Sequence, residues 1–201
     1  MGKEITMFDF ADFYDSIAEQ MPNNCRIVEV GVADGDSALY LAERLYKLGK
    51  QFTLYMVDDM SYGQYNQIVS IYENIINSAL GRFIKVIPFE SIEASKKFND
   101  NDLDFVFIDA SHQYEQTKND IRSWYAKVKD EGILAGHDYW AVEENPGVQK
   151  AVQELMPRII RRNDIPNRIF DAEQFLHDEK TKNNFGVWWV KKDFYKKLNI
   201  C

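Results

Sequence analysis

Carboxylate and imidazole side chains follow two apolar runs in the second half of the chain. Asp109 directly follows the run L-D-F-V-F-I, and His137 and Asp138 directly follow the run I-L-A-G. Side chains of these types can hold a divalent metal ion, and His112, close behind Asp109, can take up a proton near neutral pH. An ordinary interpretation also exists, in which Asp109 caps a helix or binds a ligand while His137 and Asp138 hydrogen-bond to loop backbone. The sequence leaves both open.

A second informative stretch is R-I-V-E-V-G-V-A-D-G-D-S at 26–37. Its β-branched run gives way to helical spacing from Asp36, which predicts a strand, a turn and a helix. Gly31 and Gly35 bracket the turn, where a residue without Cβ lets a ligand lie against the amides of a helix N-terminus. Asp36 or Ser37 is predicted to cap that helix.

The charge of this turn indicates the kind of ligand. Glu29, Asp34 and Asp36 lie in or beside it and favour a cationic ligand over a pyrophosphate. The dinucleotide pattern G-x-G-x-x-G is absent, because Gly31 and Gly35 lack the third glycine and its spacing. An NAD-dependent oxidoreductase on a similar sheet is therefore a disfavoured alternative.

At these residues the chain resembles the class I S-adenosylmethionine-dependent methyltransferases. Their first motif is an acid, a glycine-rich turn and a helix around a ligand with a sulfonium and an ammonium group. Two longer stretches, F-V-F-I-D-A-S-H-Q-Y-E-Q-T-K-N-D-I and G-I-L-A-G-H-D-Y-W, are similar to a small bacterial branch. That branch includes antibiotic and sugar O-methyltransferases and cephalosporin hydroxylase-like proteins. The resemblance covers Arg26 to Trp140 well and the remainder weakly.

The resemblance, with the alternation of strand and helix patterns, implies an α/β fold. We expect a Rossmann-like doubly wound sheet, mostly parallel, of seven strands, with an antiparallel strand near the C-terminus. One methyltransferase domain is expected over 1–201. It would comprise an N-terminal helix at 1–22, a cofactor-binding core at 23–140 and a C-terminal, substrate-side part at 141–201.

Apolar spacing places the individual elements. Strands are predicted at 26–32, 51–57, 82–87, 103–108, 133–136 and 186–190, and a further short strand could lie within 158–165. Helices are predicted over 7–21, from 36 to about 49, and at 68–79, 92–98, 113–128 and 145–156. The first helix either packs on the sheet edge or roofs the pocket with its aromatic residues.

The resemblance implies S-adenosyl-L-methionine as the cofactor. Asp58 ends the second strand, where a carboxylate can accept both ribose hydroxyls. Phe89, Glu90 and Ser91 fall where the family places adenine contacts, although capping of the next helix explains Ser91 equally well. The residues expected to bind the cofactor are Glu29, Gly31, Ala33, Gly35, Ser37, Asp58, Ser91 and Asp109.

The resemblance also implies roles for the strand-end cluster. Metal-dependent relatives use three acid or amide oxygens at the places of Asp109, His137 and Asp138, and several place their general base at His112. Mg²⁺ or Mn²⁺ is the ion considered, and imidazole at 137 suits Mn²⁺, Fe²⁺ or Zn²⁺ better than Mg²⁺. With His112 and Asp109 as catalytic residues, the expected reaction is methyl transfer to an oxygen of a small molecule. A non-catalytic S-adenosylmethionine-binding domain is the alternative.

Composition bounds the partners and the compartment. The chain has 201 residues and a net charge of −8, which argues against gripping nucleic-acid phosphates or an anionic membrane. Its two cysteines, Cys25 and Cys201, form no disulfide framework, which fits a reducing cytoplasm. We expect a cytoplasmic protein with a small-molecule substrate and no nucleic-acid or membrane partner. Small relatives often pair, so a homodimer is one expected state.

Overall fold

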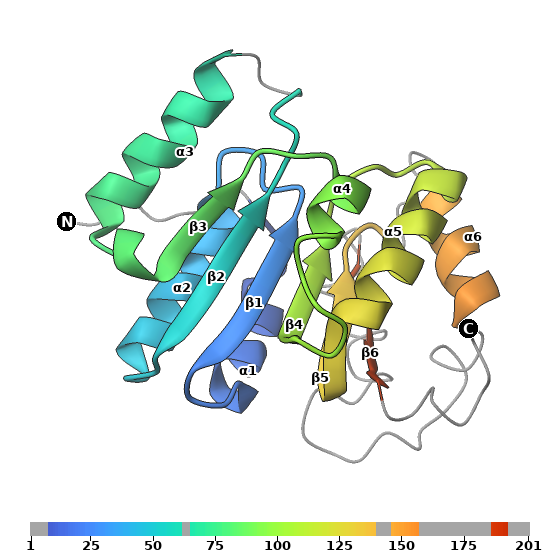
Figure 1. Ribbon diagram of the computed structural model, residues 1–201, viewed down its shortest axis with the longest axis horizontal. Helices are drawn as coiled ribbons and strands as arrows, with labels where there is room; N and C mark the ends of the chain where they lie inside the picture. The colour runs from blue at the N-terminus through green and yellow to red at the C-terminus, as the bar shows by residue number, and fades with distance from the viewer. Residues whose placement is uncertain (1–7, 62–64, 140–145, 157–185, 193–201) are drawn as a thin grey trace.

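Five parallel strands and one antiparallel strand form the sheet of this protein, seen in a computed structural model that describes residues 8–61, 65–139, 146–156 and 186–192. The strands are β1 (Cys25–Val30), β2 (Phe52–Val57), β3 (Ile84–Ile87), β4 (Leu103–Ile108), β5 (Val128–Gly136) and β6 (Trp188–Lys191). Their order is β3-β2-β1-β4-β5-β6, and β6 runs antiparallel to β5 (Figure 1).

This arrangement confirms the Rossmann-like, doubly wound fold expected from the sequence. The described residues give six strands, and the additional strand considered within 158–165 lies outside them. The predicted strand at 103–108 is β4 residue for residue, and all its side chains are buried because both faces of the sheet are covered. β5 begins five residues earlier than predicted, because Val128 pairs with Leu103 ahead of a register shift in β4.

Helices cover both faces of the sheet. They are α1 (Ala11–Gln20), α2 (Asp36–Lys47), α3 (Tyr65–Ser78), α4 (Ser91–Ser95), α5 (Tyr114–Lys127) and α6 (Pro146–Leu155), with a 3₁₀ turn, η1 (Gly81–Phe83). One apolar core joins α1, α2 and α3 to the sheet, and a second joins α4, α5 and α6 to the opposite face. Figure 1 shows α1 and α2 behind the sheet and α4 and α5 in front of it. Within the described part of the chain, no helix is long and apolar enough to cross a membrane.

Helix α1 packs over the middle of the sheet. The ring of Phe13 lies 6.2 Å from that of Phe105, and the ring of Tyr14 lies 5.1 Å from that of Phe107, both on the central strand β4. The expectation of packing at the sheet edge is therefore wrong. Because Asp109 directly follows β4, this position brings the residues just before α1 to the functional edge of the sheet.

Candidate cofactor pocket and catalytic cluster

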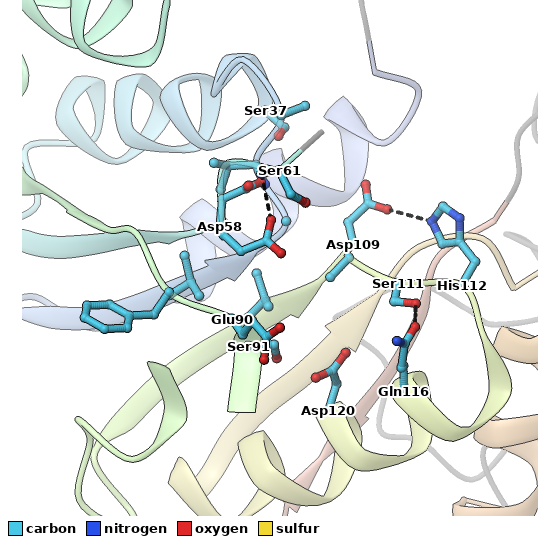
Figure 2. A pocket seen from close by; sticks show the side chains of 18 of the residues that line it. Ser37, Asp58, Ser61, Glu90, Ser91, Asp109, Ser111, His112, Gln116 and Asp120 are labelled. Carbon is cyan, nitrogen blue, oxygen red and sulfur yellow. Dashed lines mark hydrogen bonds and ion pairs between the residues drawn. The ribbon is translucent and has the colours of Figure 1, made fainter. Parts of the chain in front are cut away.

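A pocket of about 780 Å³ opens at the carboxyl ends of the parallel strands (Figure 2). The loops after β1, β2, β3 and β4 form its wall, together with the first turns of α5. Its volume is that of a typical small-molecule or cofactor site. Among the described residues its wall carries no lysine or arginine, and seven carboxyl groups line it: Asp34, Asp36, Asp58, Asp59, Glu90, Asp109 and Asp120. The pocket therefore favours a ligand with positive charge.

Gly31 joins the first loop to the end of β4. Its φ of +79° lies in the left-handed region, and a Cβ on it would lie 2.0 Å from the carbonyl oxygen of Asp109. The amide of Asp109 in turn donates to the carbonyl of Val30 at 2.7 Å. Only glycine allows the two loops to approach so closely, so Gly31 fixes the spacing between the pocket wall and Asp109.

The start of α2 differs from the sequence prediction. Gly35, with φ +87°, is the N-cap residue and makes no side-chain cap, so the prediction that Asp36 or Ser37 caps this helix is wrong. The Ser37 hydroxyl instead donates to the carboxyl group of Glu29. Ala33, Asp36 and Ser37 line the pocket, whereas Gly35 does not.

Glu29 lies beneath the pocket and not on its wall. The residue is 1% exposed, and its carboxyl group accepts hydrogen bonds from Ser37 and, at 2.8 Å, from the Tyr14 hydroxyl. Burial raises the pKa of Glu29 to about 8, and the two hydrogen bonds offset only part of this effect. Glu29 is therefore mainly protonated at neutral pH, and its contact with Ser37 holds the first turn of α2.

Asp58 lines the pocket at the end of β2 and also shapes the loop above it. One carboxylate oxygen accepts from the amide of Val32 at 2.9 Å, and the other accepts from the amide of Met60 at 2.8 Å. Each oxygen keeps a second lone pair for a ligand hydroxyl. The neighbouring Asp59 accepts from the amide of Ser61 in the same way, at 2.9 Å.

Ser91 is the first residue of α4 and not its cap, since Glu90 occupies the N-cap position. Its hydroxyl accepts from the indole nitrogen of Trp124 at 2.9 Å.

Burial raises the pKa of Asp120 to about 6, and a hydrogen bond with Ser91 opposes this shift. Asp120 lies on the pocket wall and was missed from the sequence, as were its α5 neighbours Gln116 and Asn119. The four-residue spacing of Gln116 and Asp120 on one helix face was the available signal.

At the end of the pocket the structure brings together the four predicted cluster residues. One ligand atom each from Asp109, His137 and Asp138 lies within 4.8 Å of the other two. His112 Nε2 lies 2.8 Å from Asp138 Oδ2 and 3.9 Å from Asp109 Oδ1, and Figure 2 shows His112 and Asp109 turned toward each other. Asp109 and His112 also line the pocket, so its ligand and the cluster share one space.

The cluster is strongly charged. The carboxylates of Asp109 and Asp138 raise the pKa of His112 to about 9, against the effect of partial burial. Burial also opposes protonation of His137, but hydrogen bonds with Asp138 and Asp9 outweigh it and raise its pKa to about 10. Asp138 is held in the left-handed backbone region at φ +60°, a strained conformation of the kind found at functional sites. Despite burial, its two histidine partners keep its pKa well below the ordinary value.

A match to a known protein family covers most of the residues that line this pocket. Residues 28–139, more than half of the chain, match the family model described as a methyltransferase domain. The chain therefore belongs to this methyltransferase family, with S-adenosylmethionine as its cofactor. A search of curated protein sequences gave no match.

Solved structures show the same fold at low sequence identity. SMU.1697c from Streptococcus mutans, in complex with S-adenosylhomocysteine (SAH), has a TM-score of 0.58 and 14% identity, over 80% of this chain and 85% of its own. An rRNA methylase from Streptococcus thermophilus has a TM-score of 0.53 and 15% identity, over 77% and 78%. Precorrin 8w decarboxylase from Methanobacterium thermoautotrophicum has a TM-score of 0.58 and 20% identity, over 78% and 74%.

Proposed function

We propose that this methyltransferase, as a single domain, transfers the sulfonium methyl group of S-adenosylmethionine to an oxygen of a small molecule. The observation that carries the proposal is the shared wall of the pocket and the cluster, where Asp109 and His112 face the space in which a cofactor's reactive end would lie. The pocket residues Gly31, Ala33, Ser37, Asp58 and Ser91 would hold the rest of the cofactor.

The charge of the site supports a small acceptor over a nucleic acid. The described wall of the pocket is lined by carboxyl groups without lysine or arginine, and the whole chain carries a net charge of −8. The carboxylates of such a site would repel a phosphate backbone. Lysine and arginine contacts to phosphates supply much of the affinity of nucleic-acid binding, and the described wall has none. The likeness to an rRNA methylase, at 15% identity, concerns the fold alone.

Methyl transfer needs position more than acid chemistry. The bond from sulfur to the methyl carbon breaks as the bond from the acceptor oxygen forms, so alignment of the two reactants supplies most of the rate enhancement. His112 would take the acceptor's hydroxyl proton as a general base. In the described arrangement His112 is protonated at neutral pH and paired with Asp138, so it must first release that proton.

The donor set at the cluster fits a divalent ion. Two carboxylates and one imidazole, from Asp109, Asp138 and His137, converge within 4.8 Å. When bound there, such an ion would hold the acceptor hydroxyl, lower its pKa and, by neutralising the carboxylates, lower the pKa of His112. The protein's own part is to present three ligands and keep His112 beside the acceptor.

The test is acceptor-dependent formation of SAH. Purified protein is incubated with S-adenosylmethionine and Mn²⁺, and with either a pool of hydroxylated small molecules or total RNA. We expect SAH, and a product heavier by one methyl group, only with the small-molecule pool. Formation of SAH only with RNA would overturn the acceptor class. Tight SAH binding without any turnover on either pool would favour the non-catalytic binding domain.

A further inference from the structure

Asp9, just before α1, contacts the candidate metal ligand His137 from the far end of the chain. Asp9 Oδ1 lies 2.8 Å from His137 Nε2, although the two residues are 128 positions apart in sequence. The ring of Phe10 lies 4.9 Å from the His137 ring, and the His137 amide donates to the carbonyl of Ile108 at 3.1 Å. The His137 side chain is only 10% exposed. Its ring is therefore held in one orientation by neighbours on several sides.

The contact with Asp9 decides which nitrogen of His137 faces the cluster. With Nε2 directed at Asp9, Nδ1 lies 3.5 Å from Asp138 Oδ1 and 3.9 Å from Asp109 Oδ2. We propose that Asp9 is a positioning residue that keeps the proton of His137 on Nε2 and presents Nδ1 to a divalent ion held with Asp109 and Asp138. This inference rests on the metal site of the proposed function.

Charge gives the contact a second consequence. His137 can ligate an ion only after its Nδ1 proton has left, and a neutral imidazole is a weaker partner for a hard cation than a carboxylate. His137 is the only imidazole in the three-residue donor set. A carboxylate that accepts a hydrogen bond from the second ring nitrogen of a ligating histidine fixes the histidine's tautomer and raises its basicity. The pair of Asp9 and His137 therefore carries the negative charge that a third carboxylate ligand would have carried.

The same segment also reaches the pocket, since Phe8 and Phe10 line it on either side of Asp9. Loss of Asp9 could therefore act on the metal ligand or merely loosen this part of the wall. The two roles differ in their effect on the cofactor, because a loosened wall would weaken SAH binding as well as metal binding.

The experiment measures Mn²⁺ binding by calorimetry on the full chain after treatment with EDTA. The variants are Asp9→Asn and Asp9→Ala, and the matched control is Asp12→Asn, which removes the same charge from the exposed face of α1. We expect Mn²⁺ affinity to fall by about 10- to 100-fold in both Asp9 variants. Asp12→Asn should bind Mn²⁺ like the wild type, and SAH affinity should be unchanged in all three variants.

A spectroscopic signature separates positioning from a structural role. In ¹H–¹⁵N imidazole spectra of the Zn²⁺-loaded wild type, His137 should show a coordinated Nδ1 and a protonated Nε2. In Asp9→Ala the Nε2 proton should exchange faster with water.

Three results would overturn the inference. Unchanged Mn²⁺ affinity in both Asp9 variants, beside clear binding by the wild type, would overturn it alone. A parallel loss of SAH and Mn²⁺ affinity would replace it with a structural role for Asp9. Failure of the wild type to bind Mn²⁺ would overturn the metal site of the proposed function and this inference with it, while SAH binding would still support the methyltransferase assignment.

Discussion

Glu29 and Asp138 are both buried near the functional edge of the sheet, yet at neutral pH Glu29 is mainly protonated and Asp138 is ionised. Glu29 has two hydroxyl partners, and burial raises its pKa to about 8. Asp138 has two imidazole partners, and its pKa stays well below the ordinary value. Neutral donors do not repay the cost of removing a carboxylate from water, whereas positively charged donors do. The turn between β1 and α2 is thus supported by an uncharged network of hydrogen bonds around Glu29. The cluster around Asp138 is instead held together by charged groups.

The largest expected effect comes from His112, on the charged side of this comparison. His112→Ala should lower kcat by about 10²- to 10⁴-fold, the range for loss of a general base. SAH affinity should stay nearly unchanged, because the cofactor would be held mainly by the loops after β1 and β2. His112→Gln keeps a hydrogen-bonding group beside Asp138 but cannot take a proton, so it should be equally slow. Full activity of His112→Gln would contradict a base at this position.

Gly31 lies where the turn after β1 contacts Asp109 of the cluster, so replacing it should disturb both the turn and the cluster. Gly31→Ala combines a left-handed φ of +79° with a clash against Asp109, so the free energy of unfolding should fall by about 3 kcal/mol or more. Gly49→Ala is the control, because its φ is also positive, at +71°, but nothing lies within 4 Å of the added Cβ. It should cost about 1 kcal/mol in urea unfolding. Equal costs for the two variants would show that the close approach to Asp109 is unimportant.

Replacing Asp58 tests the cofactor pocket separately from the cluster of Asp109, His112, His137 and Asp138. Asp58→Asn removes the charged acceptor of the Val32 amide and of the expected ribose hydroxyls, so SAH affinity should fall by about 10- to 100-fold. Asp59→Asn is the matched control and should weaken binding far less, because Asp59, although it also lines the pocket, accepts from the Ser61 amide and not from the turn between β1 and α2. Mn²⁺ binding should be unaffected in both variants. A loss of Mn²⁺ binding in Asp58→Asn would show that the two regions are not separable.

Per pH unit, the smallest expected effect comes from the buried proton of Glu29. Its folded pKa, about 8, exceeds the ordinary value of 4.5, so the folded state keeps a proton that the unfolded chain releases between these values. The stabilising effect of this proton is complete below pH 4.5 and is lost as pH rises toward 8. Glu29→Gln mimics the protonated form. Its free energy of unfolding should therefore fall less steeply than that of the wild type between pH 5 and pH 8, by at most about 1.4 kcal/mol per pH unit. Parallel pH curves for the two proteins would indicate that Glu29 is ionised.

Residues placed by strand ends were predictable from the sequence. Asp58, Asp109 and Asp138 each follow a β-rich run, and the parallel sheet brings such positions to one edge. The order of the elements was predictable for the same reason, because each change of apolar period marks a boundary. Boundaries themselves were less certain, as at β5, where Val128 joins the sheet through a pairing that no local pattern indicates.

The contacts made by α1 and by Asp9 just before it could not be predicted. Tyr14 reaches Glu29, and Asp9 reaches His137, only because α1 docks over the central strand, and this docking depends on packing between distant segments. The position of Gly35 as the N-cap residue of α2 was not predicted, because Asp36 and Ser37 are residue types that cap helices more often. The bond from Ser37 to Glu29 shows the reason, since the hydroxyl that could have capped α2 satisfies a buried carboxyl group instead.

The most direct test of the central claim is a calorimetric titration with SAH, in EDTA and again with added Mn²⁺, with NAD as the control ligand. We predict tight binding of SAH in both conditions, no heat from NAD and a separate heat on addition of Mn²⁺. Binding of NAD, or no binding of SAH in either condition, would contradict the assignment of the pocket to the adenosyl cofactor.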